Sequence, residues 1–326
     1  MSAISVTNFS KNFSVYKKEP GLRGFFRSLF ARKYETVEAV KNISFTIEEG
    51  ELVGFIGPNG AGKTTTLKSL AGLLYPTEGE IKVLGYNPFE RRYGFLQQIS
   101  FVMGQKNQLW WELPCMDSFL LNKEIYNVSD NKFKEIIDDL STLLEVKDFL
   151  YTPVRKLSLG QRMKMEVIAA LIHSPKVLFL DEPTIGLDVV MQKNLREFIG
   201  AYNKKYKATI ILTSHYMKDV EALCKRVIII HQGKILFDGQ LANLVKKHSS
   251  YKLITIVLRE YVDPKKIALL GDVKEFLYPQ LILKVSNKNT HKIVSKILQS
   301  LPIEDITITD PEIEEIIRDV FSKAKV

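Results

Sequence analysis

One glycine-rich segment has the residue types and the spacing to bind phosphate. Residues 57–65 fit the pattern G-x-x-x-x-G-K-[ST], and they follow an apolar run and precede a helical stretch. Glycines let successive backbone N–H groups approach a phosphate chain, and a helix start adds the positive end of its dipole. Lys63 would reach the β- and γ-phosphates, while the hydroxyl of Thr64 would bind Mg²⁺. The segment predicts a site for a nucleoside triphosphate, which would contact Gly57, Pro58, Asn59, Gly60, Ala61, Gly62, Lys63, Thr64 and Thr65.

Two adjacent carboxylates follow a second apolar run, residues 177–180. This run would form a buried strand and present Asp181 and Glu182 at its end. Asp181 would hold Mg²⁺ through water, and Glu182 would orient and deprotonate the water that attacks the γ-phosphate. An acidic pair after a strand also occurs in surface turns, so its assignment depends on the motifs around it.

An ordered set of motifs surrounds the two carboxylates. Ser158-Leu159-Gly160-Gln161 precedes them, and residues 183–188, with the sequence PTIGLD, follow at once. This set resembles the ABC ATPase family, whose signature sequence is LSGGQ, with Leu159 here in place of a glycine. The resemblance implies that Ser158, Gly160 and Gln161 close on ATP held by the opposite subunit, where a hydroxyl and N–H groups at a helix start would bind the anion. It covers about residues 4–245, and it is most similar to the ATPase components of bacterial drug-exporter-like systems.

The same resemblance assigns two residues that follow other strand-like runs. Gln105 corresponds to the glutamine that senses Mg²⁺ and the attacking water. His215 corresponds to the switch histidine that contacts the γ-phosphate, a role that suits imidazole because it can donate to phosphate while neighbours hold it. With Lys63 and Glu182, these two residues complete the predicted catalytic set.

The resemblance also implies contacts at the edges of the site. Asp188 would lie at the seam between two subunits, although it could equally cap the helix expected from residue 189 onward. Phe13 stands where the family usually has a tyrosine that stacks on adenine. Tyr16 and Tyr34 are alternatives, because the insertion between them blurs the register.

Two segments are candidates for contact with other molecules. Residues 17–34 carry six basic residues and one acidic residue, with apolar residues at helical spacing. They predict a short basic amphipathic helix, which could pack on its own domain or contact the bilayer or a membrane partner. Trp110 and Trp111 are adjacent, so in an extended segment one of them would point outward. In the family this region borders the groove that receives a coupling helix of the membrane subunit, and ordinary burial is the alternative.

The order of apolar runs predicts the fold that positions these residues. From Glu51 onward, strand-like runs alternate with helical stretches, which is typical of a largely parallel sheet flanked by helices. With the resemblance, this predicts an α/β P-loop core of ABC ATPase type over residues 1–245, with an antiparallel β subdomain and a helical signature subdomain. Residues 246–326 predict a small α+β domain of βαββαβ order with an extra terminal helix. That domain could sense a ligand, stabilise a dimer or be purely structural.

Composition limits the class of protein. No stretch approaches the roughly 20 apolar residues of a membrane-spanning helix, and residues 1–13 lack the apolar core of a secretory signal. Cys115 and Cys224 are expected to be packing residues in a reducing compartment. The net charge of +9 would suit nucleic acid or an anionic membrane surface equally well.

The motif count favours a transporter over a nucleic-acid enzyme. One phosphate loop, one signature sequence and no extended heptad run argue against ABC ATPases that act on ribosomes or DNA, so no nucleic-acid partner is expected. Two copies would bind two ATP molecules with Mg²⁺ at a shared interface. Hydrolysis would reopen the dimer and drive a separate integral membrane permease, with export favoured. The chain would be cytoplasmic and peripheral on the inner face of the cell membrane.

Overall fold

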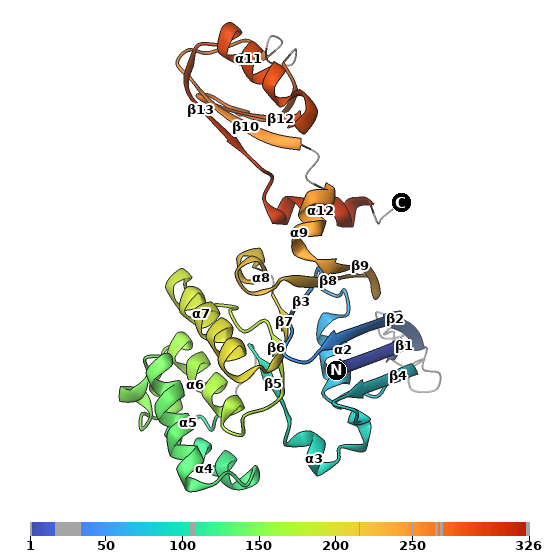
Figure 1. The fold of residues 1–326 in the computed structure, drawn as a ribbon, viewed down its shortest axis with the longest axis vertical. Coiled ribbons are helices and arrows are strands. Elements are labelled where there is room, and N and C mark those ends of the chain that lie inside the picture. The colour runs from blue at the N-terminus through green and yellow to red at the C-terminus, as the bar shows by residue number, and fades with distance from the viewer. Residues whose placement is uncertain are drawn as a thin grey trace, which may run out of the picture. The chain divides into compact units, whose positions relative to one another are not determined.

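The computed structural model describes residues 2–16, 34–104, 108–214, 216–248, 251–264, 267 and 270–323. The chain divides into two compact units, Met1–Gly239 and Gln240–Val326 (Figure 1). The sequence-based boundary at residue 245 falls a few residues later, inside helix α9 (Leu241–His248), which belongs to the second unit. Gln105, His215 and most of the predicted helix at residues 17–34 lie outside the described residues.

A six-stranded sheet forms the centre of the first unit, in the order β5-β6-β7-β3-β8-β9. Its strands are β3 (Leu52–Ile56), β5 (Ile99–Met103), β6 (Val177–Asp181), β7 (Thr209–Thr213), β8 (Arg226–His231) and β9 (Lys234–Gln240). The first five strands in this order, β5, β6, β7, β3 and β8, pair in parallel. Strands β6 and β7 are buried throughout, as expected for apolar runs covered by helices on both faces. The predicted parallel α/β core is confirmed.

Helices of the first unit form two groups. The first surrounds the central sheet and contains α2 (Lys63–Leu70), α3 (Tyr93–Leu96), α7 (Val189–Tyr206) and α8 (Met217–Leu223). The second is the helical subdomain, which contains α4 (Cys115–Ile125), α5 (Asp130–Leu143) and α6 (Leu159–Leu171). Figure 1 shows the second group on the opposite side of the unit from the antiparallel strands. Short 3₁₀ turns connect these elements at Pro88–Glu90, Lys147–Phe149 and Val154–Lys156.

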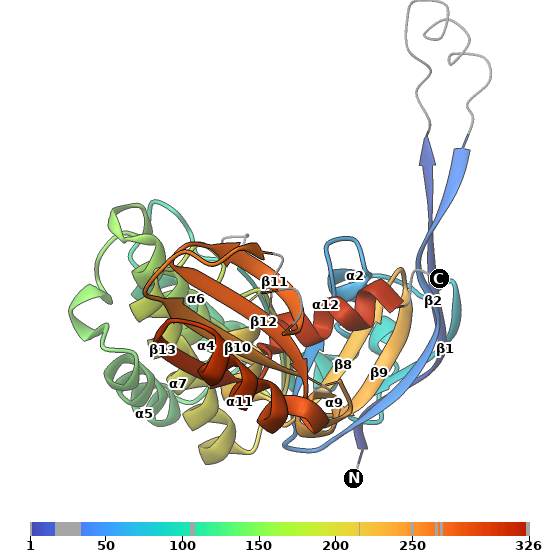
Figure 2. The same cartoon turned by 90° about the horizontal axis from the view of Figure 1, so that it is seen from above.

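A three-stranded antiparallel sheet of order β2-β1-β4 completes the first unit. It consists of β1 (Ser2–Tyr16), β2 (Tyr34–Glu48) and β4 (Glu78–Val83). Its buried residues, such as Phe9 and Phe45, share one apolar core with Phe55 of β3 and Leu67 of α2. Figure 2 shows β1 and β2 as a long ribbon that extends beyond the rest of the unit. The sheet confirms the predicted antiparallel subdomain.

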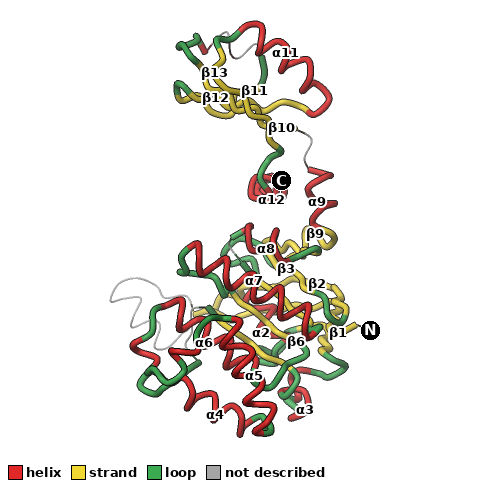
Figure 3. The backbone as a smooth tube through the Cα atoms, turned by 60° about the vertical axis from the view of Figure 1, so that its left-hand side comes forward, coloured by secondary structure: helices red, strands yellow, loops and turns green. Residues whose placement is uncertain are grey.

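The second unit is a four-stranded antiparallel sheet of order β11-β12-β10-β13 with helices (Figure 3). Its elements after α9 are β10 (Tyr251–Leu258), β11 (Asp272–Leu277), β12 (Gln280–Ser286), a 3₁₀ turn (Asn287–Asn289), α11 (Thr290–Ser300), β13 (Ile303–Thr309) and α12 (Ile313–Lys323). Ile254, Leu283 and Ile297 belong to its own apolar core. The terminal helix α12 lies beside α9. The small α+β unit expected at the C-terminal end is therefore present.

No helix among the described residues has both the length and the apolar character needed to cross a membrane.

Candidate nucleotide-binding and catalytic site

The glycine-rich loop leaves the end of β3 through a passage too narrow for larger residues. A Cβ atom at Gly57 would lie 2.2 Å from the carbonyl oxygen of Ile230, in β8. Gly62 has a φ of 109°, and a Cβ atom there would lie 2.6 Å from the carbonyl oxygen of Ala39. Both positions therefore require glycine, because even alanine would collide with backbone. The loop then passes directly into α2, whose first residue is Lys63.

Lys63 bends back over the loop from the first turn of α2. Its Nζ donates to the carbonyl oxygens of Gly57 at 2.7 Å and Pro58 at 3.2 Å, and the residue is 5% exposed. Burial lowers the pKa of Lys63, while the nearby carboxylates of Glu182 and Asp181 act to raise it. A largely desolvated ammonium interacts more strongly with phosphate charge than an exposed one. Lys63 thus lies over the glycine-rich loop, and its contact with the β- and γ-phosphates remains a prediction.

Asp181 joins the loop to two strands of the central sheet. Thr64 Oγ1 lies 2.9 Å from Asp181 Oδ2 and 3.2 Å from Oδ1, and Thr213 Oγ1 donates to Oδ1 at 2.7 Å. The parallel register causes this convergence, because Asp181 pairs with Thr213 at the carboxyl ends of β6 and β7. The sequence indicated Thr64 and Asp181 as Mg²⁺ ligands. It did not indicate Thr213, whose contact with Asp181 follows from the register of β6 and β7.

Thr64 and Asp181 fit a Mg²⁺ ion of the kind that accompanies nucleotides. Both offer hard oxygen atoms, and Mg²⁺ is usually held by one or two protein oxygens together with phosphates and water. Within the described parts of the chain, no group of three or more His, Cys, Asp or Glu residues could hold a metal alone. The donor set therefore suits a metal that arrives with its substrate.

Glu182 has a left-handed backbone with a φ of 54°, which is uncommon for a residue other than glycine. Its N–H donates to Thr213, to the hydroxyl at 3.0 Å and to the carbonyl at 3.1 Å. On the other side, a Cβ atom at Gly104 would lie 2.1 Å from the carbonyl oxygen of Glu182. The residue before Gln105 thus touches Glu182, because β5 and β6 are paired neighbours and end against each other.

A buried carboxylate that the sequence did not reveal supports this edge of the sheet. Asp219 of α8 is 0% exposed and accepts hydrogen bonds from Thr184 Oγ1 at 2.6 Å, Ser214 Oγ at 2.7 Å and Arg196 Nη1 at 2.7 Å. Thr184 is two residues beyond Glu182, and Ser214 directly precedes position 215. Asp219 therefore fixes both segments. The sequence gives no signal for Asp219, because the fold alone brings these three partners to its carboxylate.

The signature sequence forms the start of α6. Ser158 Oγ accepts from the N–H of Gln161 at 3.2 Å, and Gln161 Oε1 accepts from the N–H of Ser158 at 2.9 Å, which together make a capping box. Gly160 leaves room for Met191, whose Cγ would lie 3.0 Å from a Cβ at that position. The side chain of Leu159 reaches Gly186, within the PTIGLD segment. The signature and that segment are thus packed together within one chain.

Asp188 and Phe13 have local contacts in the isolated chain. Asp188 Oδ1 accepts from the N–H of Met191 at 2.9 Å and caps α7, as the alternative interpretation of this residue anticipated. Phe13 is half-buried in β1, with Lys11 Nζ 5.1 Å from its ring centre. The subunit seam for Asp188 and the adenine contact for Phe13 remain predictions.

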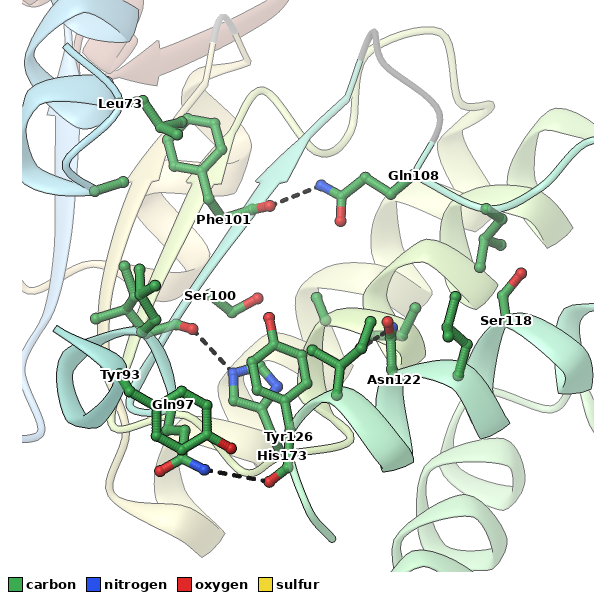
Figure 4. Close-up of a pocket in the computed structure, with 18 of the residues that line it drawn as sticks. Leu73, Tyr93, Gln97, Ser100, Phe101, Gln108, Ser118, Asn122, Tyr126 and His173 are labelled. Carbon is green, nitrogen blue, oxygen red and sulfur yellow. Dashed lines mark hydrogen bonds between the residues drawn. The ribbon is translucent and has the colours of Figure 1, made fainter. Parts of the chain in front are cut away.

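A groove separates the central sheet from the helical subdomain (Figure 4). Its cavity has a volume of about 530 Å³, and its lining includes Phe101, Trp110, Leu121 and Tyr126. Trp110 is 56% exposed and Trp111 is 47% exposed, so both adjacent tryptophans reach solvent. The expectation that at least one of them lies at the surface is confirmed.

The loop around Lys63, the Thr64–Asp181 pair and the adjoining Glu182 define a P-loop nucleoside triphosphatase. A family model described as ABC transporter matches residues 40–185, and another, described as EvrA-like ABC transporter, C-terminal domain, matches residues 250–309. The chain belongs to the ABC transporter family, as an ATP-binding and ATP-hydrolysing subunit.

Two bacterial relatives are similar to this chain over most of their own length. The ABC transporter ATP-binding protein NatA of Bacillus subtilis (strain 168) is 36% identical over 233 residues, which make up 72% of this chain and 94% of NatA. The bacitracin transport ATP-binding protein BcrA of Bacillus licheniformis is 32% identical over 220 residues, 68% of this chain and 71% of BcrA. A solved dimeric ATP-binding cassette in a post-hydrolysis state, bound to ADP and Pi, has the same fold, with a TM-score of 0.61 and 22% identity over 73% of this chain and 98% of that cassette.

Proposed function

We propose that this chain binds ATP with Mg²⁺ in the loop at residues 57–65 and that Glu182 is the general base. Glu182 would take a proton from water as the oxygen of that water attacks the γ-phosphorus, and the bond from that phosphorus to the bridging oxygen of ADP would break. When bound, Mg²⁺ would neutralise charge on the phosphate oxygens, held by Thr64 and Asp181. The observation that carries this proposal is the shared anchor at Thr213, which holds both carboxylate-bearing residues beside the loop.

The remaining roles come from the family resemblance. Gln105 would contact Mg²⁺ and the attacking water, and His215 would contact the γ-phosphate. A second copy of the chain would supply Ser158, Gly160 and Gln161 to the phosphates, with Asp188 at the seam. Support comes from the similar cassette that is dimeric and bound to ADP and Pi. Phe13 would stack on the adenine.

An integral membrane permease is the partner that we infer for the groove beside the tryptophans. The cavity is large enough for side chains of an inserted helix, and its lining combines apolar residues such as Leu121 and Ile125 with polar groups such as Gln97 and Asn122. Such a partner would hold the chain on the inner face of the membrane, in the cytoplasm. Export is the direction that we favour, because the motifs of this chain resemble those of the ATPase components of bacterial drug-exporter-like systems.

Glu182→Gln tests the proposed base. The substitution keeps the size of the side chain and removes its basicity, so ATP should bind with nearly wild-type affinity while turnover falls by about 100-fold or more. The ATP-bound dimer should accumulate, and light scattering with phosphate release would measure both effects. Glu135→Gln, on an exposed face of α5, is the matched control. Wild-type turnover in Glu182→Gln would contradict the assignment.

A further inference from the structure

The signature helix α6 holds the segment that carries both tryptophans. Glu166, on α6, accepts from the backbone N–H of Gln108 at 2.9 Å to Oε1 and 3.0 Å to Oε2, and from the N–H of Leu109 at 3.2 Å. One turn earlier on the same helix, the guanidinium of Arg162 lies 5.8 Å from the ring centre of Trp111. The helix therefore binds this segment at two points.

These two residues are aligned with the signature serine. Ser158, Arg162 and Glu166 follow one another at intervals of four, which places them along one face of α6. Ser158 is at the end of the helix that a second copy would meet, whereas Glu166 and Arg162 face the segment beside the groove. One rigid helix thus joins the two locations.

Glu166 is an unusual residue to find inside a helical subdomain. It is 3% exposed, although ionised carboxylates are rarely buried without partners. Burial raises the pKa of Glu166, and the N–H groups of Gln108 and Leu109, followed by the charge of Arg162, act to lower it. An apolar residue would pack here without this cost, so the carboxylate is placed to hold the backbone of Gln108 and Leu109.

Gln108 extends the connection to the central sheet. Its side-chain Nε2 donates to the carbonyl oxygen of Phe101, in β5, at 2.7 Å (Figure 4). Strand β5 ends beside Glu182, through Gly104. The backbone of Gln108 is therefore attached to the signature helix, and its side chain is attached to the strand that leads to the catalytic edge.

We propose that Glu166 is a positioning residue that makes residues 108–111 move with the signature helix, so that closure of two copies on ATP changes the surroundings of the tryptophans. The proposal rests on the nucleotide-dependent dimer proposed above. It goes further in assigning the link between Ser158 and the segment beside the groove to one buried carboxylate.

Tryptophan fluorescence of the full chain provides a direct test, because Trp110 and Trp111 are the two tryptophans of the sequence. In the wild type, a non-hydrolysable ATP analogue with Mg²⁺ should form the dimer and shift the emission maximum. Glu166→Ala should lose that shift while it still dimerises. Glu166→Gln retains one carbonyl oxygen that can accept from both N–H groups, so it should recover part of the shift. Glu135→Ala, on the exposed face of α5, should behave as the wild type.

Each outcome has a distinct meaning. A full shift in a dimerising Glu166→Ala would overturn the inference and leave the dimer proposal intact. If the wild type neither dimerises nor shifts, both are overturned. Should Glu166→Ala fail to fold, Arg162→Gln provides the second measurement, because it removes the cation near Trp111 and leaves Glu166 in place. Arg162→Gln should reduce the shift, and an undiminished shift would contradict the proposal.

Discussion

At the scale of single residues, the catalytic edge depends on a threonine that no motif identifies. Thr213 Oγ1 donates to Asp181 and accepts from the N–H of Glu182, and Thr213 is fully buried. One hydroxyl thus orients the proposed Mg²⁺ ligand and, together with the carbonyl of Thr213, holds the backbone of the proposed base in its left-handed conformation. Both carboxylates would be present without this hydroxyl, but their positions would be less defined.

Thr213→Val tests whether the two carboxylates need the Thr213 hydroxyl to hold them in position. Valine keeps the shape of threonine and removes both hydrogen bonds, so the free energy of unfolding should fall by about 1–3 kcal/mol. The rate of ATP hydrolysis should fall more than the affinity for ATP, because the loop around Lys63 is unchanged. Urea denaturation and single-turnover kinetics would measure the two effects. Thr213→Ser retains the hydroxyl and should stay close to the wild type, whereas normal turnover in Thr213→Val would show that the hydroxyl is dispensable.

At the scale of elements, the sequence predicted the strands that begin and end at strong local patterns. Residues 52–56 and 177–180 are apolar runs followed by phosphate-binding or acidic residues, and the structure has strands there. Asp219 and Glu166 could not be predicted in the same way. Their partners lie on other elements of the chain, and only the packed fold brings those groups together. For Asp188, the local sequence pattern indicated the helix cap that the structure has, whereas its place at the seam between two subunits rests on the family resemblance alone.

Asp219 should prove to be the anchor of two catalytic segments. Asp219→Ala would leave Arg196 partly buried and without its carboxylate, which should lower the free energy of unfolding by about 3–5 kcal/mol. The double variant Asp219→Ala/Arg196→Met removes both charges and should regain part of that stability. It should not regain ATP hydrolysis, because Thr184 and Ser214 would still lack their shared acceptor. Chemical denaturation and phosphate release would measure both, and restored hydrolysis in the double variant would refute the anchoring role.

At the scale of the whole molecule, each unit has its own apolar core, and the first unit has two sheets where the second has one. The first unit contains the loop, the carboxylates, the signature and the groove. The second unit has an antiparallel sheet that matches a C-terminal domain found in related transporters. ATP chemistry and the proposed permease contact therefore belong to one unit, and they lie at two edges of the same central sheet, joined through β5 and α6. This arrangement predicts that the permease contact can be lost without loss of nucleotide binding.

Leu121→Asp tests that separation. Leu121 lies on α4 in the lining of the groove, so an aspartate there would place a charge where an apolar helix of the permease should insert. Affinity for ATP should remain at the wild-type level, because Leu121 does not contact the loop at residues 57–65. Capture of the chain by its permease in detergent should be lost. Leu143→Asp introduces the same charge on exposed α5, outside the lining of the groove, and should preserve capture. Equal capture of the two variants would place the permease contact elsewhere on the chain. Loss of capture in Leu121→Asp alone would assign the contact to the groove, beside the segment that Glu166 holds to the signature helix.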